Sequence, residues 1–83
     1  MVKEENWAVS LRRVREFFAQ QPDVSETPEG FRFQDCRITL TETQSTLLGH
    51  WDMPRTIVRI EGSDEAVLAI HRRFYLRFLS AGG

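Results

Sequence analysis

The sequence predicts a two-layer α+β domain in which an N-terminal and a C-terminal helix pack on one face of a three- or four-stranded antiparallel sheet. Apolar residues recur at helical spacing near both ends of the chain and alternate with polar residues along its middle. The 83 residues, 41% of them hydrophobic, suffice for one small core. We therefore expect a single domain over residues 1–83 with the element order α-β-β-(β)-β-α.

A first helix is predicted over residues 5–20, because four apolar residues follow one another at spacings of 4, 3 and 4. Glu4 and Glu5 suit the N-terminal end of a helix dipole, and Pro22 follows the predicted C-terminal end. The residues of this stripe are Trp7, Leu11, Val14 and Phe18.

Residues 22–30 are interpreted as an exposed acidic loop. They contain two prolines, one glycine and three acidic residues, with Val24 as the single apolar residue. Such a short stretch is a connection within one domain rather than a linker between two.

Two short alternating segments follow this loop. Phe31 and Phe33 alternate with polar residues, and Cys36, Ile38 and Leu40 alternate in the opposite parity. Because a change of parity would move a strand's buried face to the other side, a bulge, a tight turn or a short hairpin near residues 34–35 must reset it.

The clearest strand is predicted over residues 55–61, where Val58 and Ile60 alternate with charged residues. Pro54 cannot donate a hydrogen bond to a neighbouring strand, so we place the start of this strand directly after it. Residues 45–51 fit either a short strand or a turn, and we favour a strand.

The last helix is predicted over residues 64–80. Ser63 is a natural N-cap, and two acidic residues follow it in the first turn. The apolar face is wider than contact with one sheet requires, so part of it should pack on something else. Residues 81–83 are expected to be a flexible tail. The residues of the wide face are Val67, Leu68, Ile70, His71, Phe74, Tyr75, Phe78 and Leu79.

The composition excludes several classes of protein. A single cysteine, Cys36, cannot form an intramolecular disulfide, and with His50 and His71 it does not match a zinc-site spacing. The glycines fit neither a dinucleotide fingerprint nor a phosphate-binding loop. We therefore expect no metal, no cofactor and no catalysis. The absence of a signal peptide or a long apolar run predicts a soluble, cytoplasmic protein without membrane contact.

Arginine is the most distinctive residue of this chain, since it supplies ten of the eleven basic side chains while the net charge is -1. The arginine clusters form an anion-binding face in one interpretation, because the guanidinium group suits phosphate and carboxylate. In the interpretation that we favour, they are solvated or paired with nearby acidic residues. The candidate anion-binding residues are Arg12, Arg13, Arg15 and Arg77.

A short segment around Trp51 collects side chains that carry function. An exposed Trp51 would be a hot spot for a protein partner, and His50 with Asp52 would form an acid–base pair. Alternatively, Trp51 caps the small core while its neighbours face water, which is the interpretation we favour. Cys36 is expected to be buried and inert, and His71 to be a packed residue whose ring tip reaches a partner.

Two resemblances to known families follow from these residues. The element order is similar to that of double-stranded RNA-binding domains, but Gly62-Ser63-Asp64-Glu65-Ala66 stands where that family has a lysine-rich motif that grips phosphates. Gly82 and Gly83 resemble the tail of ubiquitin-like sulfur carriers, in which a free diglycine end is activated as an adenylate. In those carriers a strand leads to the tail, whereas a helix is predicted here, so we favour an ordinary frayed end.

We therefore predict a non-catalytic protein-interaction or assembly module, with a second copy of the chain as a candidate partner. The alternative is a domain that binds the backbone of RNA or DNA through its arginine clusters. The residues expected to contact a protein partner are Trp51, Arg72, Arg73, Tyr75 and Leu79.

Overall fold

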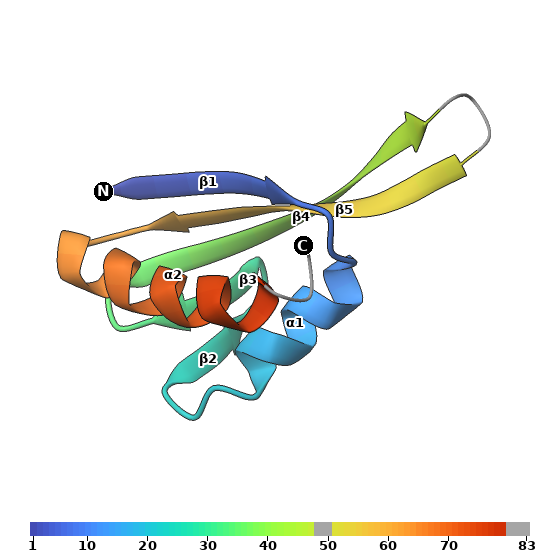
Figure 1. Ribbon diagram of the computed structural model, residues 1–83. Helices are drawn as coiled ribbons and strands as arrows, with labels where there is room; N and C mark the ends of the chain where they lie inside the picture. Colours follow the sequence, from blue (N-terminus) through green and yellow to red (C-terminus); the bar gives the residue numbers. More distant parts are fainter. Residues whose placement is uncertain (48–50, 80–83) are drawn as a thin grey trace.

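The computed structural model describes the backbone of residues 1–47 and 51–79, and the side chains of residues 1–43 and 54–79. This part of the chain forms five strands and two helices (Figure 1). None of the described helices is long and apolar enough to cross a membrane. The elements are β1 (Val2–Trp7), α1 (Leu11–Ala19), β2 (Val24–Thr27), β3 (Gly30–Phe33), β4 (Cys36–Leu47), β5 (Trp51–Glu61) and α2 (Asp64–Phe78).

The strands form one antiparallel sheet in the order β1-β5-β4-β3-β2. From β2 to β5, each strand pairs with the next one along the chain, and β1 pairs with β5. Helix α1 therefore carries the chain from one edge of the sheet to the other, and both helices lie against the same face of the sheet (Figure 1). The α+β class is confirmed, but the sheet has five described strands rather than three or four, and the chain enters through a strand.

The N-terminal segment corrects the prediction of a helix over residues 5–20. Residues Val2–Trp7 pair with β5 along their whole length, and α1 begins only at Leu11. Ser10 is the N-cap, and its side-chain oxygen accepts a hydrogen bond from the Arg13 backbone N–H. Trp7 fits both patterns, because it lies in phase with the stripe of α1 and also with alternate residues of β1.

The segment 22–30 is also corrected, since it contains strand β2 rather than only an exposed loop. Val24 lies opposite Phe33 and is partly buried against the core. The pairing of this segment with β3 therefore makes it a strand, although its composition, rich in acidic residues and proline, is typical of a loop. Gly30 lies so close to β4 that a Cβ atom there would clash with the carbonyl oxygen of Ile38.

The change of parity after Phe33 is resolved as a tight hairpin, one of the three alternatives. Strand β3 ends at Phe33, β4 begins at Cys36, and those two residues lie opposite each other. Gln34 in the turn has a φ of 55°, a left-handed conformation that is uncommon for a residue with a side chain. The hairpin lets Phe31, Phe33 and the alternate residues of β4 share one buried face.

The hairpin of β4 and β5 is longer than its neighbours. Pro54 lies inside β5, opposite Gln44, so the predicted start of this strand at residue 55 is wrong. The last described pair is Leu47 with Trp51, whereas the pairing of β1 with β5 ends at Thr56. The distal part is therefore a two-stranded ribbon that extends beyond the helices (Figure 1). Within the predicted segment 45–51, residues 48–50 lie outside the described residues.

The core lies between the sheet and the two helices. Aromatic rings link the two layers: Phe18 of α1 stacks on Phe74 of α2 at 5.7 Å between centroids and contacts Phe31 of β3 at 5.6 Å. Thr56 is the one buried polar residue of the described chain, and its hydroxyl donates a 2.7 Å hydrogen bond to the Val9 carbonyl. The buried hydrophobic residues are Val9, Val14, Phe17, Phe18, Phe31, Phe33, Cys36, Ile38, Val58, Ile60, Ala66, Val67, Ile70, Phe74 and Phe78.

Candidate functional site

Helix α2 begins as predicted. Ser63 caps it by accepting a hydrogen bond from the Ala66 backbone N–H, and two acidic residues occupy its first turn. The helix ends at Phe78, two residues before the predicted end, and the predicted tail at 81–83 lies outside the described residues. Its 15 residues have a buried and an exposed side, and both carry large apolar side chains.

The exposed side of α2 forms the candidate site. Four large apolar side chains project from it with 41% to 61% of their surface exposed, whereas those of the buried side are 1% exposed or less. Side chains three and four residues apart lie on one face of a helix, so these residues form a continuous surface. We call this surface the outer stripe; it consists of Leu68, Arg72, Tyr75, Leu76 and Leu79.

Tyr75 is held in place within the outer stripe by two neighbouring rings. The ring of Trp7 meets it edge to face at 5.9 Å between centroids, and the ring of His71 stacks on it at 6.0 Å. Trp7 in turn contacts the buried Phe74 at 5.1 Å. Tyr75 therefore presents an exposed ring whose orientation is set by the core, which lowers the conformational entropy lost when a partner binds it.

His71 and Glu5 join α2 to the edge strand β1. His71 Nε2 lies 2.7 Å from Glu5 Oε1, and the Trp7 indole N–H donates to the same oxygen at 3.1 Å. Partial burial tends to raise the pKa of Glu5, but the hydrogen bonds from His71 and Trp7 outweigh it and lower that pKa below its ordinary value. The prediction that His71 is packed with its ring tip on a partner is confirmed.

The two arginines predicted beside this surface have different surroundings. Arg73 forms a two-pronged ion pair with Asp23 at 2.7 and 2.9 Å, and its guanidinium lies 5.1 Å from the centre of the Phe33 ring. Hydrogen bonding between the pair lowers the pKa of Asp23 and raises the pKa of Arg73. Arg72 is exposed and forms no ion pair within the described residues.

The four predicted anion-binding arginines divide into two groups. Arg12 pairs with Glu16 at 3.2 Å, and Arg15 pairs with Glu26 at 3.5 Å. The guanidinium carbons of Arg13 and Arg77 lie 5.7 and 5.4 Å from the centre of the same ring, that of Phe78. The fold thus brings Arg13 and Arg77 together in a notch between the helices, whereas Arg12 and Arg15 contact acidic residues.

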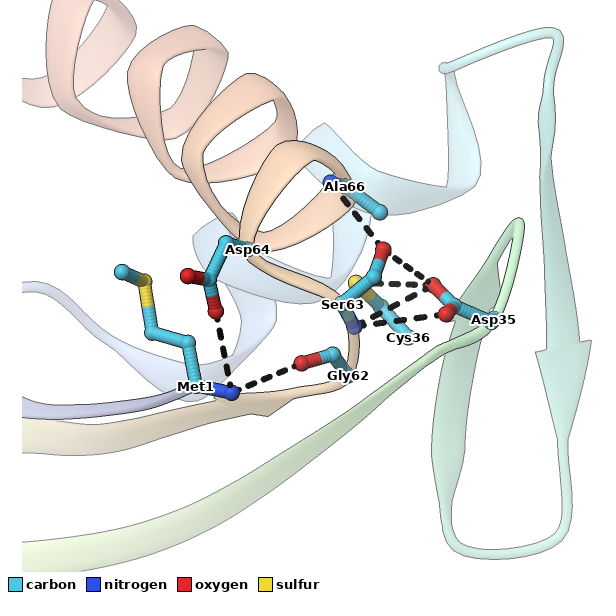
Figure 2. Close-up of polar contacts among 7 residues, drawn as sticks. All are labelled: Met1, Asp35, Cys36, Gly62, Ser63, Asp64 and Ala66. Carbon is cyan, nitrogen blue, oxygen red and sulfur yellow. Dashed lines mark hydrogen bonds and ion pairs between the residues drawn. The ribbon is translucent and has the colours of Figure 1, made fainter.

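A second set of polar contacts closes the corner where β5 leads into α2. The Asp35 carboxylate accepts hydrogen bonds from the Ser63 hydroxyl at 2.9 Å and from its backbone N–H at 3.3 Å (Figure 2). The Met1 amino group donates to the Gly62 carbonyl at 2.9 Å and lies 3.4 Å from Asp64. These bonds join the N-terminus before β1 and the turn between β3 and β4 to the start of α2. Sequence reasoning missed them, because Asp35 and Ser63 are 28 residues apart.

A surface hollow of about 660 Å³ adjoins this corner. Arg32 and Arg37 line it from directly opposite positions on β3 and β4. Glu29 and Glu61 line it too, so its charges are mixed. The fold gives this hollow no set of groups that favours one ligand charge.

Within the described residues, the side chains that the sequence suggested for catalysis are not brought together into a catalytic group. Cys36 is buried, and this burial together with the nearby charge of Asp35 raises the pKa of its thiol. His50 lies outside the described residues, as do the side chains of Trp51 and Asp52; the Trp51 backbone starts β5 at the far end of the ribbon. Within the part of the chain that the structure describes, no three His, Cys, Asp or Glu residues are grouped to hold a metal.

Over the residues that the structure describes, the chain is a small α+β domain with a five-stranded antiparallel sheet, two helices on one face and an exposed apolar helix surface. Residues 2–83 match the family described as Archaeal MoaD-like protein, and the chain belongs to this family. None of the curated proteins and none of the solved structures compared with the chain matches it.

Proposed function

We propose that this chain is a non-catalytic protein-interaction module that binds its partner through the outer stripe of α2. The observation that carries the proposal is the exposure of four large apolar side chains along one side of a helix whose other side already fills the core. The surface has the composition of the middle of an interface, with an aromatic residue, aliphatic residues and arginine and with no acidic residue among its five members.

Site-specific photo-crosslinking in the native host tests this proposal. A photoreactive phenylalanine derivative replaces Leu76 in one variant and Thr41 in a matched control, since Thr41 is exposed on the other face of the sheet. We expect position 76, and not position 41, to yield a crosslinked peptide that mass spectrometry assigns to one protein. Equal labelling from both positions, or none from position 76, would contradict the proposal.

Binding to a nucleic-acid backbone is the alternative function, and the placement of Arg13 and Arg77 on one ring supports it. Three other arginines, Arg12, Arg15 and Arg73, contact acidic residues and so contribute less positive charge. Fluorescence anisotropy with duplex RNA and single-stranded DNA at low and physiological salt distinguishes the two functions. Saturable binding that weakens steeply with salt and is lost in Arg13→Gln and Arg77→Gln would favour the alternative.

The family match supports a further candidate function, because it extends through Gly82 and Gly83. This pair resembles the activated tail of ubiquitin-like sulfur carriers, although here it follows α2 rather than a strand. A carrier requires Gly83 to be the free C-terminus of the protein in the cell. Intact-protein mass spectrometry tests both points: a chain ending at Gly83 with one terminal oxygen replaced by sulfur supports this function, and any other C-terminus refutes it.

A further inference from the structure

Four of the five residues of the outer stripe of α2 are symmetric in their spacing. Leu68, Arg72, Tyr75 and Leu79 follow one another at intervals of 4, 3 and 4 residues, so the order of intervals is the same in either direction. The first and last of these four residues are leucines, and the two between them are a cation and an aromatic ring. All four side chains are exposed.

We propose that a second copy of this chain is the partner that covers the outer stripe, with the two α2 helices antiparallel across a two-fold axis. This inference rests on the proposed function, and it specifies the partner and the register. Each Arg72 then lies over Tyr75 of the second copy, and each Leu68 packs against Leu79 of the second copy. The axis passes between residues 73 and 74.

The chemistry of the four positions favours this register. A guanidinium is attracted to the face of an aromatic ring, so the central pair attracts in both symmetric copies. Arg72 is available for this contact, since it forms no ion pair within the described residues. Tyr75 is already oriented by Trp7 and His71. Two-fold interfaces require a surface that is complementary to itself, and these four positions meet that requirement.

Other arrangements of the two helices leave these groups unmatched. Parallel helices in register would place Arg72 against Arg72, a repulsive contact. Moving the antiparallel register by one turn, or four residues, in either direction would place Arg72 opposite His71 or Leu79 of the second copy rather than its Tyr75. The stripe is about 16 Å long at 1.5 Å per residue, which corresponds to a small interface and a dimer that depends on concentration.

A pair of cysteine variants tests the register directly. Leu68→Cys and Leu79→Cys are prepared separately and then mixed under mild oxidation, with the unsubstituted chain as control because its only cysteine, Cys36, is buried. We expect a disulfide between the two variants in the mixture, since positions 68 and 79 face each other in the proposed register. Neither variant should crosslink with itself, because identical positions would lie about 16 Å apart along the axis.

A pair of charge variants supplies the second test. Recovery of a dimer in their mixture shows that each variant is folded, so a variant that fails to fold is recognised. Tyr75→Arg sets the introduced guanidinium opposite Arg72 of the second copy, so this variant should stay monomeric. An equimolar mixture of Tyr75→Arg with Arg72→Glu should restore a mixed dimer, visible by native mass spectrometry, because the introduced arginine faces the introduced glutamate. A mixture that remains monomeric, or cysteine variants that crosslink only with themselves, would overturn the proposed register.

These results separate the inference from the proposed function. If the unsubstituted chain is monomeric at all concentrations while position 76 still crosslinks to another protein, the second copy is the wrong partner and the interaction module stands. If position 76 crosslinks to nothing and the chain is monomeric, both are refuted. Crosslinking of position 76 to α2 of a second copy supports both.

Discussion

The two sides of α2 carry similar residue types, but one side is buried and the other is exposed to solvent. On the inner side Val67, Ile70 and Phe74 are fully buried against the sheet and α1, whereas on the outer side Leu68 and Leu76 are about half exposed. Burial of the inner side is required by the fold, because those side chains form the centre of the core. The outer side chains contribute little to folding, so their apolar character points to a role outside the monomer.

The largest effect is expected on the inner side. Phe74→Ala removes a ring that contacts Trp7, Phe17 and Phe18, and we expect a loss of about 3–5 kcal/mol in the free energy of unfolding. Denaturant titration followed by circular dichroism measures it. Leu76→Ala is the matched control on the outer side. A loss at Leu76 as large as that at Phe74 would remove the distinction between the two sides.

A smaller effect on the free energy of unfolding is expected at the N-cap of α2. This cap fixes the start of the helix and so the position of both its buried and its exposed side. Ser63→Ala removes the cap on the Ala66 N–H and the hydrogen bond to Asp35, at a cost of about 1 kcal/mol in stability. The same denaturant titration applies, with the exposed Ser25→Ala in β2 as control. An unchanged midpoint in Ser63→Ala would show that the cap does not help to fix α2.

The contact between Glu5 and His71 lies at the boundary of the two sides and gives a pH-dependent prediction. Because the folded pKa of Glu5 is below its ordinary value, the unfolded chain binds the proton more readily as the pH falls. The contribution of Glu5 is therefore present above its ordinary pKa and is lost as the pH falls through the folded pKa.

The difference in stability between the unsubstituted chain and Glu5→Gln measures this contribution. We expect the difference to favour the unsubstituted chain at pH 7 and to decrease as the pH falls below about 4. A difference that stays constant across this range, or one that grows as the pH falls, would show that the folded pKa of Glu5 is not lowered.

The smallest effect on folding is expected on the outer side itself. Leu68→Ser should change the free energy of unfolding by no more than about 0.5 kcal/mol, because the side chain is already half exposed. The same variant should weaken self-association, measured by light scattering after size-exclusion chromatography. If Leu68→Ser unfolds the protein, the outer stripe belongs to the core and the comparison between the two sides fails.

The sequence predicted the elements whose pattern is local. The alternation of Val58 and Ile60, the cap at Ser63 and the buried face of α2 each follow from neighbouring residues, and the structure confirms them. Exposure of Tyr75 and Leu79 was also predictable, because the apolar face of α2 is wider than the sheet contact requires.

The errors arose where contacts distant in the chain decide the structure. Trp7 fits a helical stripe equally well, and only pairing with β5 makes its segment a strand. Strand β2 was missed because its pairing with β3 outweighs the local signal of two prolines and three acidic residues. The ion pair of Arg73 with Asp23 joins α2 to the segment before β2. Because these two segments are distant in the chain, neither of them alone predicts the ion pair.

Sedimentation equilibrium of the unsubstituted chain and of Tyr75→Arg, over a wide range of concentration, tests the central claim most directly. The unsubstituted chain should change from monomer to dimer as its concentration rises, while Tyr75→Arg stays a monomer with an unchanged circular dichroism spectrum. An unsubstituted chain that is monomeric throughout, or a Tyr75→Arg variant that dimerises equally well, would contradict the assignment of the outer stripe to a second copy.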